Sequence, residues 1–235
     1  SGNSPRTRAA TEMSLSATSI PATDAKLRTL GGNYARVLGT RRYVALGAAF
    51  SLLFAAQGFL IGAAPDFISN VLGLPETDFA YLFVPLVAGA MAGALLAARK
   101  AGRWSDGRIT LLSYLLMGGS CLAYVLYMAA ADAPRLPWAV LLPGLFTCGL
   151  AMGVPAMTLR ILGQVPDLSG TAASVLGFMQ MLTFSVASGW GVPWVYGQPL
   201  RLAAAMLACV AASAIGWAWL HRLAAPVAKT EAGLG

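Results

Sequence analysis

Six long stretches of the chain carry no Asp, Glu, Lys or Arg, and short charged segments separate them. The stretches cover residues 43–65, 79–98, 109–131, 136–159, 168–200 and 202–220. A membrane-spanning helix needs ~20 predominantly apolar residues, because the hydrocarbon core is ~30 Å thick. The fifth stretch is too long for one span, but it contains the helix breakers Gly189, Gly191, Pro193, Gly197 and Pro199. We therefore predict an all-α polytopic membrane protein with six transmembrane helices, at about 43–64, 79–98, 109–131, 137–159, 169–191 and 200–220.

Composition agrees with this pattern and excludes an ordinary soluble domain. Apolar residues make up 57% of the chain and charged residues only 11%, whereas charged residues are about 25% of soluble domains. The chain has a net charge of +7, which by itself is compatible with nucleic-acid binding. The positions of the charges, however, favour a different explanation.

Basic residues gather in alternate connecting segments. Fourteen of the 16 basic residues precede the first span, lie between spans two and three or between four and five, or follow span six. The opposite side receives only Arg135 and Arg201. The positive-inside rule then places both termini in the cytoplasm, so the basic excess is a topology signal and we expect no nucleic-acid partner.

Chemistry-bearing residues are scarce. Cys121, Cys148 and Cys209 each fall inside an apolar stretch, without metal-ligand spacing, and the chain has one histidine, His221. We interpret the cysteines as packing residues and expect no metal, no cofactor and no catalytic residues. Residues 1–32 are predicted to be a flexible cytoplasmic linker or tail, 33–222 the transmembrane domain, and 223–235 a cytoplasmic tail. Within residues 26–42, a short interfacial helix and a basic flank of the first span are both open.

The spans are rich in glycine and proline. GxxxG spacing occurs at Gly58 and Gly62, at Gly89 and Gly93, and at Gly149 and Gly153. Small residues at this spacing let two helix backbones approach closely, either within the chain or in a dimer. Three prolines, Pro85, Pro143 and Pro155, sit inside spans two and four, where proline bends a helix.

No charged residue lies well inside a span, although such residues usually mark ion paths. Uncharged polar groups and flexible or aromatic side chains are present instead, and these suit a cavity for apolar or weakly polar molecules. The candidate cavity residues are Phe54, Gln57, Met152, Pro155, Thr171, Gln180 and Met181.

Three segments carry a resemblance to a known family. They are NYARVLGTRRYVALGAAFSLLFAAQGFLIGAAPDFIS (33–69), GAMAGALLAARKAGRWSDGR (89–108) and GVPAMTLRILGQVPDLSGTAASVLGFMQM (153–181). In these segments the chain resembles the major facilitator superfamily and, within it, the Bcr/CflA-type drug-resistance transporters. The third segment is the most specific, and the likeness covers roughly residues 30–222. Asp66 and Arg160 depart from the family's pattern, either as charges at opposite mouths of a cavity or as residues tolerated at the membrane edge.

The resemblance implies the carboxyl-terminal six-helix half of a twelve-helix carrier in a bacterial inner (plasma) membrane. Spans one, two, four and five would line the cavity, and spans three and six would face lipid. Substrate would bind at the midplane between this half and an amino-terminal half. The basic loop between spans two and three would gate the cytoplasmic mouth through Arg99, Arg103, Asp106 and Arg108.

The expected function is therefore proton-coupled efflux of drugs or small metabolites by alternating access. The partners expected are the lipid bilayer, a small-molecule substrate, and an amino-terminal half or a second copy of the chain. The coupling carboxylate would have to come from the partner, because none is expected to be buried here. Two alternatives remain open: a half-size membrane protein that works as a homodimer or regulator, and an intramembrane serine protease, which needs a serine and a histidine within hydrogen-bond reach.

Overall fold

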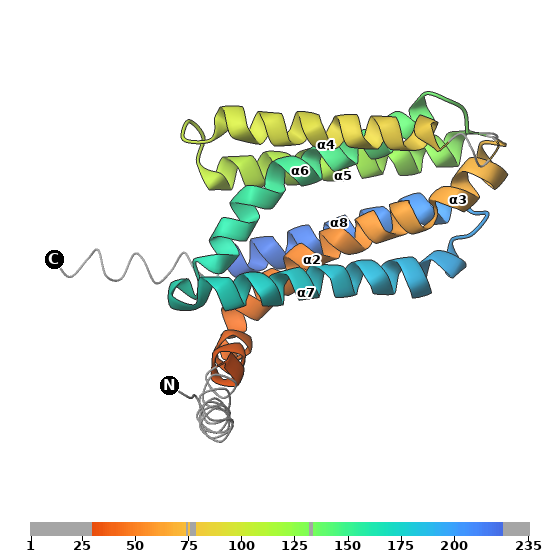
Figure 1. The fold of residues 1–235 in the computed structure, drawn as a ribbon. Coiled ribbons are helices and arrows are strands. Elements are labelled where there is room, and N and C mark those ends of the chain that lie inside the picture. The colour runs from red at the N-terminus through yellow and green to blue at the C-terminus, as the bar shows by residue number, and fades with distance from the viewer. Residues whose placement is uncertain (1–29, 74, 76–78, 132–133, 223–235) are drawn as a thin grey trace, which may run out of the picture.

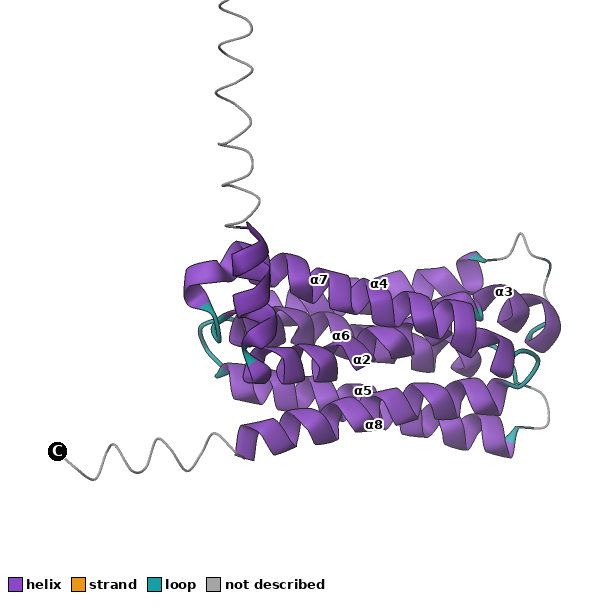
Figure 2. Cartoon of the chain, turned by 90° about the horizontal axis from the view of Figure 1, so that it is seen from below, coloured by secondary structure: helices purple, strands orange, loops and turns teal. Residues whose placement is uncertain are grey.

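The computed structural model describes residues 30–73, 75, 79–131 and 134–222. Every regular element in this part of the chain is helical (Figure 2). The six long helices are α2 (Arg41–Gly62), α4 (Ala80–Lys100), α5 (Asp106–Ala130), α6 (Trp138–Leu162), α7 (Ser169–Val186) and α8 (Pro199–Arg222). Six helical segments, the fifth extending from Pro166 to Trp194, are long and apolar enough to cross a membrane. The prediction of a six-helix polytopic membrane protein is confirmed.

Short elements extend two of these helices at the same end of the bundle. After α2 the chain continues through α3 (Ala64–Asp66) and the π-helical turn η1 (Phe67–Val71). After α7 it continues through the π-helical turn η4 (Ala187–Gly191) and the 3-10 turn η5 (Val192–Trp194). Helical structure therefore persists past Gly189 and Gly191, while Pro199 begins α8. A hydrophobic environment favours continued backbone hydrogen bonding, which explains why these glycines do not end the helix.

The helices form two groups of three (Figure 1). In one, α6 packs against α4 and α5, and in the other, α2 packs against α7 and α8. Contacts between α5 and α8 and between α2 and α6 join the groups. These main contacts are unchanged when α2, α4 and α5 are exchanged with α6, α7 and α8. The two halves of the sequence are thus equivalent in their packing, as in folds built from inverted three-helix repeats.

Aromatic and sulfur-containing side chains fill the interior. Tyr43, Phe50, Phe146 and Met157 are fully buried. Large apolar side chains also point outward, for example Leu115 on α5 and Ile215 on α8. Helices that are apolar on every side are typical of a protein whose surroundings are lipid.

The segment before α2 is helical over residues 30–39, and Thr40 separates it from α2. Its Val37 is buried, while Leu30, Tyr34 and Leu38 are exposed. The chain is therefore helical here with an exposed apolar side, as expected for a helix at a membrane interface. Residues 30–32, the end of the predicted linker, belong to this helix. The rest of the linker (1–29) and the predicted tail 223–235 lie outside the described residues.

Candidate functional site

Close contacts join α2 to α7 and to its extension η4. A Cβ atom placed on Gly58 would lie 2.6 Å from the carbonyl oxygen of Phe184, and one on Gly62 would lie 2.5 Å from Oγ of Ser188. The Thr183 hydroxyl, also on α7, donates a hydrogen bond of 2.8 Å to the carbonyl of Ser51. The first predicted GxxxG pair therefore serves a contact within the chain.

The contact between α4 and α6 is built in the same way. Gly89 and Gly93 face the backbone carbonyls of Gly144 and Cys148 so closely that neither site has room for a Cβ atom. Thr147 donates a hydrogen bond of 3.0 Å to the carbonyl of Leu86 across this contact.

The third GxxxG pair, Gly149 and Gly153, packs against Met117 and Ser113 of α5. All three glycine faces are thus occupied inside the six-helix body. A dimer built through these faces would require the body to open.

The predicted cavity residues on α2 lie one turn apart. Phe54 packs edge-on against Phe50, with 5.6 Å between ring centroids. The side-chain oxygen Oε1 of Gln57 is buried and has no hydrogen-bond partner. A buried amide oxygen without a partner is costly, so Oε1 of Gln57 is an unsatisfied acceptor on α2.

The predicted residues on α7 are spread along the helix. Thr171 and Gln180 are half-buried and Met181 is exposed. Nine positions separate Thr171 from Gln180, a rise of about 13 Å along the axis, so the structure does not bring them together. Because Thr183 bonds Ser51, Gln180 lies nearer the level of Ser51 than that of Gln57.

The two predicted cavity residues on α6 have different surroundings. Met152 is buried in a cluster with Ala156 and with Ile109 of α5, and its contacts are therefore internal to the six-helix body. Pro155, three positions on, is exposed. Figure 1 shows α6 starting beside α4 and ending near the start of α7, so this helix passes from one group to the other.

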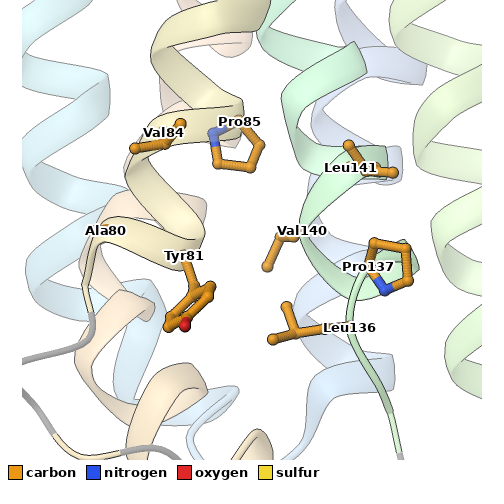
Figure 3. A pocket seen from close by; sticks show the side chains of 8 residues that line it. All are labelled: Ala80, Tyr81, Val84, Pro85, Leu136, Pro137, Val140 and Leu141. Atoms are coloured by element: carbon orange, nitrogen blue, oxygen red, sulfur yellow. The ribbon is translucent and has the colours of Figure 1, made fainter.

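The sequence did not indicate a hollow between the first turns of α4 and α6 (Figure 3). It has a volume of about 510 Å³ and is lined by Ala80, Tyr81, Val84, Pro85, Leu136, Pro137, Val140 and Leu141. Its surface is apolar, so it can accept an apolar group. None of the seven predicted cavity residues lines it. Pro85 was the available signal, because a proline inside a helix removes a backbone hydrogen bond and bends the helix.

The predicted gating residues Arg99, Arg103, Asp106 and Arg108 are all exposed. They lie in and beside the turn between α4 and α5. In the same turn the Lys100 ammonium lies 4.6 Å from the centroid of the Trp104 ring. This cation–π contact, which sequence reasoning missed, joins the end of α4 to the turn.

Asp66 corrects one expectation. No buried carboxylate was expected from the sequence, yet Asp66 is 6% exposed. Its Oδ2 accepts a hydrogen bond of 2.7 Å from the backbone N–H of Gly197, and its Oδ1 accepts one of 2.8 Å from Nδ2 of Asn70. Because α2 continues into α3, Asp66 lies next to the turn between η5 and α8.

Within the described residues, no group of three or more His, Cys, Asp or Glu side chains is placed to hold a metal ion. Cys121, Cys148 and Cys209 are free cysteines. The side chain of His221, on which the serine-protease alternative depends, lies outside the described part.

Comparisons with known proteins give two groups of similar sequences. A protein named "Multidrug transporter MdfA" from Escherichia coli is 29% identical over 167 residues, which are 68% of this chain and 39% of that protein. Its namesake from Edwardsiella piscicida is 27% identical over 175 residues, 73% of this chain and 42% of that protein. The chain thus spans about two fifths of the length of these relatives. No protein-family model matches it.

Proposed function

We infer that this chain, a homologue of the multidrug transporters of the major facilitator superfamily, acts as a six-helix half of a carrier for drugs or small metabolites. Its six apolar helices fit one half of such a carrier. The carrier would work in the bacterial inner membrane and expel its substrates by alternating access. This function is that of a transporter and involves no enzymatic step.

One structural observation carries the proposal: α4 and α7 are left largely uncovered. Only 17% of the spanning window of α4 is buried, and 22% of that containing α7, against 67% in α6. These two helices occupy equivalent positions when the sequence halves are exchanged. Two exposed, equivalently placed helices offer symmetrical edges for a second six-helix unit.

The substrate would be held between the two units. Phe54 offers an aromatic surface on α2, and Oε1 of Gln57 offers a buried acceptor. Gln180 and Met181 on α7 would add an amide and an apolar contact, with Thr171 and Pro155 closer to the mouth formed by the end of α6 and the start of α7. Met152 would pack behind these cavity residues, because it clusters with Ile109 of α5.

Transport would be driven by proton antiport, with the titrating carboxylate in the other unit. Asp66, the buried carboxylate that the structure describes, already accepts two hydrogen bonds at one end of the bundle. Asp66 lies in α3, beyond the end of α2, and so away from the midplane where the coupling carboxylate is expected. The exposed arginines of the α4–α5 turn would meet the other unit at the cytoplasmic mouth.

The proposal is tested by transport into vesicles with an imposed pH gradient. The chain is expressed alone and fused to its upstream coding sequence, and ethidium uptake is followed. We expect pH-driven movement only with the fused protein. Movement by the chain alone would instead support a homodimer, which the exposed faces of α4 and α7 also allow.

The site is tested in the fused protein with Gln57→Ala and Gln180→Ala together. We expect a loss of at least tenfold in the transport rate, since each lost hydrogen bond is worth about 1 kcal/mol. Gln198→Ala is the matched control, because this glutamine is exposed in the turn before α8. Unchanged rates for a panel of cationic and neutral substrates would contradict the proposed site.

A further inference from the structure

A groove between α5 and α8 has an arginine, and no acidic residue, among its lining side chains. It has a volume of about 430 Å³. Its apolar walls come from Leu111 and Leu115 on α5 and from Ala214 and Ala218 on α8. The small alanines create the space, and the exposed leucines keep it open toward the surroundings of the bundle.

Two polar side chains stand at one end of this groove. Arg160, in the last turn of α6, lines it and is half-buried. Thr110 on α5 also lines it and is 4% exposed, and its hydroxyl Oγ1 has no hydrogen-bond partner. By contrast, Tyr114 deeper in the groove already shares a hydrogen bond of 2.9 Å with Ser213. The groove thus holds one cation and one unused hydroxyl.

The charge at this end favours an anion. No acidic side chain lines the groove. Asp106 lies one turn before Thr110 at the start of α5 and would oppose an anion, whereas Arg108, one turn before Leu111, adds a second positive charge. An arginine at the end of a membrane helix can extend its guanidinium to the level of lipid phosphates.

We propose that this α5–α8 groove is a binding site for an anionic phospholipid. The phosphate accepts hydrogen bonds from Arg160 and from the Thr110 hydroxyl, and one acyl chain lies along Leu111 and Leu115. Guanidinium groups match phosphate oxygens in a two-bond geometry. The apolar walls select a lipid over a free phosphate, because a soluble ion gains nothing from them. Basic pockets between membrane helices are suited to anionic headgroups in general.

Native mass spectrometry of the full chain in detergent tests the proposal. Phosphatidylglycerol and phosphatidylcholine with the same acyl chains are added together, and the ratio of the bound lipids is measured. We expect phosphatidylglycerol to be preferred, and Arg160→Gln to reduce the preference about fivefold, the factor for about 1 kcal/mol per basic side chain at an anionic surface. Arg160→Lys should keep part of the preference, since it keeps the charge but not the two-bond geometry.

Matched variants separate this site from general electrostatics and from misfolding. Arg201→Gln removes an exposed arginine from the opposite end of the bundle and should leave the ratio unchanged. Thr110→Val should lower it, whereas Ser113→Ala should not, because the Ser113 hydroxyl is already bonded to the carbonyl of Ile109 at 2.9 Å. Asp106→Asn should raise it.

Three results would overturn the proposal. The first is an equal loss of preference in Arg160→Gln and Arg201→Gln. The second is competition by glycerol phosphate as effective as that by phosphatidylglycerol, which would make this a site for soluble phosphates. The third is a preference that Thr110→Val leaves unchanged while the unfolding temperature of the variant matches that of the wild type.

Discussion

Gly93 is one of two glycines at which α4 lies against the backbone of α6, and no larger residue fits there. The position of its missing side chain is taken by the backbone of Cys148. A backbone cannot turn away as a flexible side chain can, so a substitution must push the two helices apart. An interior glycine of this kind lowers the helix propensity of its segment, but it lets two helix backbones pack closely.

We predict that Gly93→Leu lowers the stability of the protein. Overpacking lowers the free energy of unfolding by about 1–3 kcal/mol where side chains can shift. At Gly93 the neighbour is backbone, so we expect a loss at least this large. The measurement is the temperature at which half of the protein remains monodisperse in detergent. Gly119→Leu on α5 is the control, since nothing lies within 4 Å of that site. Equal temperatures for the two variants would show that the α4–α6 contact is looser than described.

At the scale of the elements, an acidic side chain ties the outer extension of α2 to the turn before α8. Asp66 connects α3 to the turn before α8 through the N–H of Gly197. Gly197 has a positive φ of 66°, a conformation that glycine adopts without strain. The turn therefore depends on both residues, one for its shape and one for its attachment.

We predict that Asp66→Ala frees this turn without unfolding the bundle. A hydrogen bond to a charged group contributes about 1.5–3 kcal/mol, so local amide exchange around Gly197 should accelerate tenfold or more. Hydrogen–deuterium exchange with mass spectrometry measures this directly. Asp167→Ala, at an exposed acidic residue before α7, should leave the turn unchanged. Unaltered exchange at 195–199 in Asp66→Ala would mean that the hydrogen bond contributes little.

At the scale of the whole molecule, the two ends of the bundle differ in charge. The turns after α4 and before α7 lie at one end with most of the described arginines, and the turns before α6 and α8 lie at the other. Charge placement of this kind sets the orientation of membrane helices during insertion. The arginine-rich end should therefore face the cytoplasm.

This orientation predicts the sidedness of cysteine labelling. Ser105→Cys and Gln198→Cys introduce thiols in exposed turns at opposite ends. A membrane-impermeant maleimide added to intact spheroplasts should label Gln198→Cys at once and Ser105→Cys only after permeabilisation. The unmodified chain, with Cys121 and Cys148 buried and Cys209 half-buried, gives the background. The reverse pattern would invert the topology and, with it, the assignment of the gating loop.

The number of spans could be predicted because each membrane helix satisfies its own backbone hydrogen bonds and must match the bilayer thickness. That constraint acts locally, so apolar length, with the helix breakers of the fifth stretch, located all six. The candidate site was less accessible. Met152 and Gln57 look equally suited to a cavity in the sequence, but Met152 packs against Ile109 while the Gln57 oxygen stays unpartnered. In helices that are apolar all round, no polar face marks the inside.

The sequence by itself determined the fold class, the six spans and the alternation of charge between the two ends. The tertiary structure alone decided which helices are neighbours, that all three glycine pairs are used within the chain, and that Asp66 is buried. It also decided that Arg160 and Thr110 line the same groove between α5 and α8, although 50 positions separate them. The reason is that membrane helices associate by close packing between backbones that are far apart in the sequence. Because lipid is as apolar as the helix interfaces, the hydrophobic pattern does not show which helices pair.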